Sequence, residues 1–352
     1  MEIVYLNKIF NNTQNSYKYY WWLSITEICF NKNQREISFD EIILKIISKL
    51  WYPVNYFKLS FGKIDQCSKY IKQIQSEYHL EENISERDLY QFLIKYKSSD
   101  FLLNITNELT RYVPYRFIRP WFSEKTRGLK DSKVNSKILE LQNESSPYTI
   151  GHESKIIMIN KDWFQWINTN YILIKSYTLY ELIKYLEKEN PNVANLSRKL
   201  EKPNARNLST PTKYWKKFIL KEPNHTDVFE NKPLFKLKNI SIDHFIPWSF
   251  MTHDLIWNLH PINKRINSSK SNNLPQKRYF QNFYKLQYNF CTFLLDESSN
   301  KPLEDYYKLF NCSNEELKIL SKEQFIERMD QFYMPQYEIA KNMGFEYNWK
   351  LN

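Results

Sequence analysis

One segment of the chain, residues 241–275 (SIDHFIPWSFMTHDLIWNLHPINKRINSSKSNNLP), constrains its fold and chemistry more than any other. Over a short length it brings together one carboxylate, one imidazole, two carboxamides and one ammonium: Asp243, His244, Asn258, Asn267 and Lys270. Cutting a phosphodiester needs a proton acceptor, oxygen ligands for a cation and a positive charge, and this set supplies all three. We therefore interpret the segment as the candidate catalytic centre.

The first part of this segment predicts a strand that breaks into a loop. Apolar residues surround the Asp243–His244 pair over Leu237–Ile246, and Pro247 follows them. Neighbouring side chains on a regular strand point to opposite faces. Asp243 and His244 can therefore share a site only where the strand stops being regular, and Pro247 supplies such a break.

The second part predicts another strand and then a helix. Leu255–Leu259 is short and apolar enough for a strand, and Pro261 suits the start of a helix. Helical spacing then puts Asn267 and Lys270, three residues apart, on one face. The predicted order is strand, loop, strand, helix.

Three motifs, DHFIPWSF, WNLHP and NKRINSSKSNNLP, resemble the HNH endonucleases, whose ββα-metal fold has this layout. The likeness is closest to the HNH domain of RNA-guided CRISPR nucleases, with a similar DH-x-x-P-x-SF opening and N-x-x-KS-x-N-x-P close. The resemblance implies that His244 is the general base and Asp243 a metal ligand. It also implies that Asn258 holds the loop and that Asn267 fills the last HNH position as a second ligand.

The chemistry of these groups supports the same roles. Hydrolysis of a phosphodiester needs an activated water and a cation that stabilises phosphoryl charge. A histidine, with an unperturbed pKa of ~6.5, can take a proton at neutral pH. The oxygens of Asp243 and Asn267 suit Mg²⁺, with Mn²⁺ as a substitute. Lys270 is expected to stabilise the phosphate as a point charge.

The simpler alternative gives each of these residues a structural role, as a turn cap, a core histidine or a loop former. It is the better interpretation of any one of them alone, but not of the whole set. For His253 and His260 we favour structural roles, although His260 alternates onto the same strand face as Asn258. Asp254 is expected to be a surface or turn residue.

The charge balance favours a polyanionic partner. The chain has 50 basic and 39 acidic residues, a formal net charge of +11. Arg198–Lys221 contains one acid, Glu201, and none occurs between Asp254 and Asp296. The candidate nucleic-acid contacts are Lys213, Lys216, Lys217, Lys264, Arg265, Lys277 and Arg278. A merely solvated basic face is the competing interpretation.

The rest of the chain predicts helices. Apolar residues recur at helical spacing between Ser16 and Phe122. The aromatic run YYWW at 19–22 is interpreted as part of a bundle core in preference to a base-stacking surface. Arg111–Lys137 is expected to be a linker with a basic face, and Tyr148–Ile159 a small hairpin. Three pairs have the spacing of a helix capping box: Ser38 with Glu41, Ser313 with Glu316, and Ser321 with Gln324.

The predicted architecture is mainly α with a small embedded α+β core of the ββα-metal type. Residues 1–122 are expected to form a helical N-terminal domain that is regulatory or binds a protein partner. A mainly helical middle region with the basic segment follows at 148–235. The nuclease core is placed at 236–280, and C-terminal helices at 281–352 are expected to pack on it.

The cysteines and the hydropathy pattern predict a soluble cytoplasmic protein. Cys29, Cys67, Cys291 and Cys312 lie far apart without a CxxC motif, as expected of free thiols in a reducing compartment. No secretory signal and no apolar stretch of membrane-spanning length is evident.

Together these features predict a Mg²⁺-dependent endonuclease that hydrolyses DNA, with double-stranded DNA as its partner. The company that HNH domains keep suggests a bacterial anti-phage defence or restriction role. Two alternatives stay open: an RNA-cleaving HNH nuclease, and a cleavage-silent HNH-derived DNA-binding module that acts with a partner.

Overall fold

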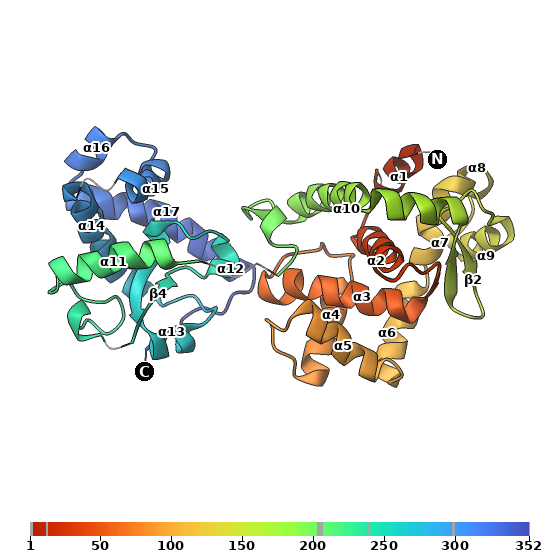
Figure 1. Ribbon diagram of the computed structural model, residues 1–352, viewed down its shortest axis with the longest axis horizontal. Coiled ribbons are helices and arrows are strands. Elements are labelled where there is room, and N and C mark those ends of the chain that lie inside the picture. Colours follow the sequence, from red (N-terminus) through yellow and green to blue (C-terminus); the bar gives the residue numbers. More distant parts are fainter. Residues whose placement is uncertain (1–2, 12, 203–206, 238, 298–299, 352) are drawn as a thin grey trace. The chain divides into compact units, whose positions relative to one another are not determined.

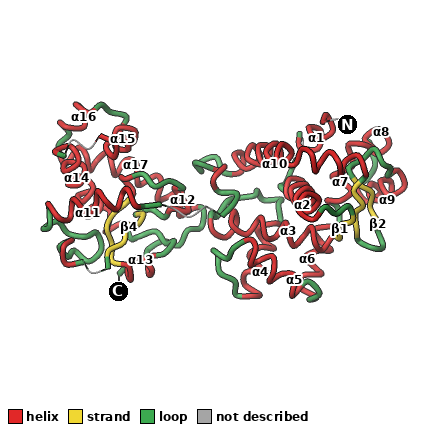
Figure 2. Tube along the Cα trace, in the orientation of Figure 1, coloured by secondary structure: helices red, strands yellow, loops and turns green. Residues whose placement is uncertain are grey.

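The computed structural model describes residues 3–11, 13–202, 207–237, 239–297 and 300–351 (Figures 1 and 2). The chain divides into two compact units, Met1–Lys202 (unit 1) and Pro203–Asn352 (unit 2). Helices dominate both, and the described strands form a three-stranded sheet in unit 1 and a two-stranded sheet in unit 2. The predicted class, mainly α with a small α+β core, is confirmed.

Unit 1 is a helical bundle beside its small sheet. Its helices are α1 (Ile3–Phe10), α2 (Tyr17–Lys32), α3 (Phe39–Trp51), α4 (Cys67–Tyr78), α5 (Glu86–Tyr96), α6 (Asp100–Thr110), α7 (Val113–Ile118), α8 (Ser123–Thr126), α9 (Asp131–Leu141) and α10 (Lys161–Glu189). Its strands are β1 (Glu36–Ser38), β2 (Tyr148–Gly151) and β3 (Ile156–Ile159). The antiparallel order is β1-β3-β2, so the predicted hairpin is confirmed and gains a third strand.

Helix α2 lies at the centre of unit 1, between α10 and α3 (Figure 1). The aromatic run at 19–22 is buried. Trp22 stacks on Phe117, with ring centroids 5.1 Å apart. The indole of Trp21 donates a hydrogen bond of 3.0 Å to the hydroxyl of Tyr148. These rings form the bundle core, as predicted, and are not accessible for base stacking.

Two expectations about unit 1 need correction. Arg111–Lys137 is folded and is not a linker: it contains α7, α8 and most of α9, and Phe117 and Val134 are fully buried. The apolar residues among the basic ones were the missed signal. The boundary expected near residue 122 also differs from the observed one, because α10 packs on α2 and β3 pairs with β1.

Unit 2 surrounds its two strands, β4 (Ile240–His244) and β5 (Leu259–Asn263), with helices. The helices are α11 (Ser209–Lys221), α12 (Trp248–Met251), α13 (Lys264–Lys270), α14 (Phe280–Asp296), α15 (Asn300–Phe310), α16 (Asn314–Ile319) and α17 (Lys322–Asn342). Phe245, just after β4, stacks on Phe283 of α14 at 4.0 Å between centroids and contacts Tyr333 of α17. The C-terminal helices therefore pack on the strands, as expected.

The helix caps follow their sequence signals. Complete capping boxes at Ser313 and Ser321 begin α16 and α17. At Ser38 one half of the box is present: the hydroxyl accepts from the backbone N–H of Glu41 at 3.2 Å, whereas the Glu41 carboxylate pairs with Lys32 at 2.5 Å.

The cysteines are free, as predicted, and three of the four are buried. Burial raises the pKa of the Cys29 thiol to about 12, so this thiol is protonated and unreactive at neutral pH. Within the described residues no helix has the length and apolar character that crossing a membrane requires.

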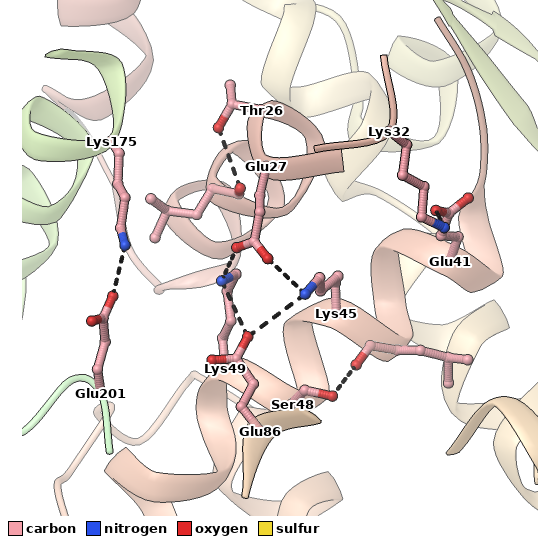
Figure 3. A network of polar contacts seen from close by, with 12 residues as sticks. Thr26, Glu27, Lys32, Glu41, Lys45, Ser48, Lys49, Glu86, Lys175 and Glu201 are labelled. Atoms are coloured by element: carbon pink, nitrogen blue, oxygen red, sulfur yellow. Dashed lines mark hydrogen bonds and ion pairs between the residues drawn. The ribbon is translucent and has the colours of Figure 1, made fainter. Parts of the chain in front are cut away.

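An ion network joins three helices of unit 1 (Figure 3). Glu27 of α2 lies between Lys45, at 2.6 Å, and Lys49 of α3, while Glu86 of α5 approaches the same two ammonium groups at 3.8 and 3.3 Å. Burial alone would raise the pKa of Glu27, but the two lysines more than offset it, so this pKa lies below its usual value. The Glu27, Lys45 and Lys49 side chains are only 14–19% exposed, so the network is a partly buried one.

We expect Glu27→Gln to destabilise unit 1, because two largely buried ammonium groups lose the closer of the two carboxylates that they share. The loss should be about 3 kcal/mol, at the low end for breaking a buried pair. For a unit of this size that lowers Tm by roughly 6–12 °C, measurable by calorimetry of the full chain. Glu140→Gln is the control, since its 2.7 Å pair with Lys137 is exposed and worth at most about 1 kcal/mol. Equal Tm values for the two variants would contradict the role of the network.

Candidate active site

The site is built on a strand–strand–helix frame. β4 and β5 pair antiparallel, with Asp243 opposite His260 and Ser241 opposite Ile262. α13 follows β5 without a loop, because the side chain of Asn263 caps it by accepting from the backbone N–H of Arg265 at 2.8 Å. The helix packs on both strands. The predicted order of elements is therefore correct.

Two boundaries in this frame were wrong. The expected strand at Leu255–Leu259 is largely a 3₁₀ turn, Ile256–Asn258, and β5 begins only at Leu259. Pro261 lies inside β5 and does not start the helix. β5 has a single partner strand among the described residues, so a proline without an N–H is tolerated on its open edge.

Asn258 is a clamp for the loop after β4. Its side chain accepts from the backbone N–H of Ile246 at 3.1 Å and donates to the carbonyl of Ile246 at 2.9 Å. Its own carbonyl accepts from Phe245 N–H at 2.8 Å. Asn258 is fully buried, so it fixes the backbone after the Asp-His pair and does not reach a substrate.

Lys270 is fully buried and bonded to the end of β4. Its ammonium donates to Asp243 Oδ2 at 2.9 Å and to the backbone carbonyl of His244 at 2.7 Å. Burial alone would raise the pKa of Asp243, but nearby positive charge, chiefly the Lys270 ammonium, more than offsets it, so this pKa lies below its usual range. The expected contact of Lys270 with a phosphate is thus replaced by an internal ion pair.

His244 pairs with Asp254, a residue that the sequence led us to expect at the surface or in a turn. Its Nε2 lies 2.9 Å from Asp254 Oδ1, and the imidazole is 3% exposed. Asp243 and His244 are the last two residues of β4, so the strand ends at the pair and ahead of Pro247, as predicted. The missed signal was an acid in the polar turn THDL, where a carboxylate can reach the strand end.

Asn267 faces the same strand as Lys270, as the helical spacing predicted. Its amide nitrogen donates to the Ser241 hydroxyl at 3.1 Å. This bond orients the carboxamide, because the nitrogen must point to Ser241 and the oxygen away from it. Ser241 and Asp243 share one face of β4, so the Asn267 carboxamide and the Asp243 carboxylate lie over the same side of the sheet.

His260 is fully buried on that same face. The rings of Phe229, Phe245 and Phe283 contact it, with centroids 5.4, 6.1 and 5.7 Å away. Its Nδ1 lies 3.2 Å from the carbonyl of Pro261. Burial lowers the pKa of the imidazole to about 4, and the Asp243 charge opposes this only in part. His260 is therefore neutral at neutral pH.

The candidate nucleic-acid contacts all have exposed side chains: Lys213, Lys216, Lys217, Lys264, Arg265, Lys277 and Arg278. Lys217 and Lys221 both pair with Glu297, and Lys277 pairs with Glu338 at 2.7 Å. Such exposed ion pairs are weak, so a polyanion can displace them.

Within the described part of the chain, no three His, Cys, Asp or Glu side chains gather closely enough to hold a metal ion. A carboxylate and a carboxamide remain, at Asp243 and Asn267. These hard oxygens suit a cation that keeps several of its waters.

Residues 227–276 match the HNH endonuclease family. No curated protein and no solved structure matches the chain. The match spans β4, β5 and α13 and begins before the expected core at 236–280. The added segment contains Phe229, which packs on His260. The match indicates nuclease activity on nucleic acid, and the chain therefore carries a domain of the HNH endonuclease family at residues 227–276.

Proposed function

We propose that this protein is a Mg²⁺-dependent endonuclease that hydrolyses phosphodiester bonds of double-stranded DNA. The observation that carries the proposal is the end of β4. Asp243 is held there by Lys270 at 2.9 Å and His244 by Asp254 at 2.9 Å, with Asn267 on the adjacent helix. A restriction or anti-phage setting is proposed from the resemblance alone.

The residues present fit a hard divalent cation. Lys270 binds Oδ2 of Asp243, and no hydrogen bond from the described residues reaches Oδ1. The Ser241 hydroxyl accepts a hydrogen bond from the amide nitrogen of Asn267, so the carboxamide oxygen of Asn267 can act as a metal ligand. Asp243 and Asn267 would hold the ion. A bound Mg²⁺ would supply positive charge that stabilises the phosphoryl group during cleavage.

His244 is the proposed general base. Because the Asp254 carboxylate accepts a hydrogen bond from Nε2–H of His244, the lone pair of the neutral imidazole is on Nδ1. Nδ1 can then accept a proton from an attacking water. The carboxylate also stabilises the imidazolium that forms. Asp254 is thus a positioning residue, and Asn258 keeps the loop beside His244 in place.

Lys270 has an indirect role in this proposal. Its ammonium keeps Asp243 ionised and fixes the rotamer of that carboxylate, both of which prepare the site for a cation. Charge toward the DNA comes instead from the exposed residues of α11, α13 and the segment before α14, among them Lys213, Lys264 and Arg278. The chemistry uses no residue of unit 1, so we propose that unit 1 binds a regulatory protein partner.

We expect His244→Ala to abolish plasmid cleavage while DNA binding persists, because removal of a general base costs about 10²–10⁴-fold in rate. The measurement is conversion of supercoiled plasmid in the presence of Mg²⁺. The control, His79→Ala, removes an exposed histidine of unit 1 and should cut at the wild-type rate. Wild-type cleavage by His244→Ala would exclude His244 as the base.

We expect chelation by EDTA to stop cleavage, and both Asp243→Ala and Asn267→Ala to require more metal. The effect of Asp243→Ala should be the larger, because a carboxylate contributes a charge and an amide only a dipole. Titration of cleavage with Mn²⁺ measures this. An unchanged metal requirement in both variants would refute the ligand assignment. If only Asn267→Ala is silent, Asn263 is the next candidate.

We expect DNA affinity to fall steeply with salt, because each neutralised phosphate adds about −0.9 to the slope of log affinity against log salt. The double variant Lys213→Glu/Lys216→Glu should make the slope shallower by roughly the contribution of two phosphate contacts. The double variant Lys277→Glu/Arg278→Glu should have the same effect. Filter binding on His244→Ala avoids cleavage during the assay. Lys95→Glu with Lys97→Glu, in unit 1, is the control. A wild-type slope in both unit 2 variants would leave a solvated basic face as the explanation.

A further inference from the structure

We propose that His260 Nε2 is a third, nitrogen ligand of the divalent cation that Asp243 and Asn267 would hold. This inference rests on the proposed function and assigns its site one further residue. The carrying observation is a fully buried imidazole nitrogen that has no hydrogen-bond partner among the described residues.

The tautomer of His260 directs a lone pair to Nε2. Nδ1 lies 3.2 Å from the Pro261 carbonyl, an acceptor, so Nδ1 carries the hydrogen and donates it. Histidines that bind metals are held in this way, with the other ring nitrogen donating to a backbone carbonyl. Nε2 is then a pure acceptor, and leaving a buried acceptor without a partner is unfavourable.

The position of His260 brings that lone pair to the side of the sheet that carries the cation. His260 and Asp243 are directly opposed in the β4–β5 register, which puts their Cβ atoms roughly 4.5–5.5 Å apart on one face. Asn267 of α13 lies over the same face. A single ion can therefore be reached from β4, β5 and α13 together.

The surroundings of His260 favour a ligand over a titrating group. The three phenylalanine rings hold the imidazole plane by packing and offer it no hydrogen bond. A histidine with only a packing role could be replaced here by another aromatic ring without loss of cation binding.

A nitrogen ligand changes which ion the site prefers. Carboxylate and amide oxygens alone suit Mg²⁺, whereas an imidazole favours ions later in the first transition series. With His260 included, the site should bind Mn²⁺ more tightly than Mg²⁺. This preference for Mn²⁺ over Mg²⁺ should depend on His260 and not on Asp243, because a carboxylate binds either ion.

The experiment uses the full-length protein without DNA, so that binding is measured apart from cleavage. Mn²⁺ is titrated into wild type, His260→Phe, Asp243→Ala and His244→Ala, and nitrogen coupling to the bound Mn²⁺ is recorded by pulsed electron paramagnetic resonance. Phenylalanine suits the aromatic surroundings and cannot bind the ion. His244→Ala removes the neighbouring imidazole, so coupling that persists in this variant does not come from His244.

We expect nitrogen coupling in wild type and in His244→Ala, its loss in His260→Phe, and Mn²⁺ binding at least about tenfold weaker in that variant. Coupling that is absent from wild type, or wild-type Mn²⁺ affinity in His260→Phe, would overturn the inference. If Asp243→Ala weakens Mn²⁺ binding in that case, the proposed function stands without His260. If Asp243→Ala binds like wild type, the proposed metal site fails as well. If His260→Phe does not fold, the nitrogen coupling is compared in His244→Ala protein made with unlabelled and with ¹⁵N-labelled histidine. A coupling that changes with the label supports a histidine ligand, and one that does not change overturns the inference.

Discussion

A single buried ammonium group organises the proposed catalytic centre of unit 2. Lys270 is fully buried, and its ammonium donates to two groups at the end of β4: the Asp243 carboxylate at 2.9 Å and the His244 carbonyl at 2.7 Å. An unpaired ammonium in this position would be strongly unfavourable, so the contact fixes α13 against the strand. The residue proposed to bind the cation and the backbone that carries the proposed base are therefore set by one side chain.

The strand–strand–helix frame is too small to bury a core by itself, and helices beyond the family match complete it. The side chain of Gln287 in α14 donates a hydrogen bond to the carbonyl of Leu259 at 2.7 Å. The hydroxyl of Tyr306 in α15 donates to the side-chain oxygen of Gln287 at 2.5 Å. Tyr333 of α17 donates to the Trp257 carbonyl at 2.9 Å. These bonds satisfy the backbone where β5 begins. The C-terminal helices thus help to hold the strand–strand–helix frame in place.

Much of this arrangement could be predicted from the sequence, because the signals were local. The spacing of Asn267 and Lys270 gave their shared helix face, and the motifs around Asp243 gave the order of elements. What failed depended on contacts between distant residues. Asp254 is an ordinary turn acid until the fold brings it to His244, and Pro261 suggests a helix start until the strand edge is known. Arg111–Lys137 looked like a linker because its charges are more conspicuous than Phe117 and Val134, which pack inside.

The two histidines of the strand pair show how the fold can give the same side chain two kinds of chemistry. β4 turns His244 toward a carboxylate, which holds one nitrogen and stabilises the charge that a base acquires. β5 turns His260 to the other face, into phenylalanine rings that disfavour the charged form. An imidazole that acts as a base must be able to become cationic, whereas an imidazole that binds a metal must stay unprotonated; these are the roles proposed for His244 and His260. The alternation of side chains along paired strands, set by the register of Asp243 with His260, keeps these two requirements apart within one small site.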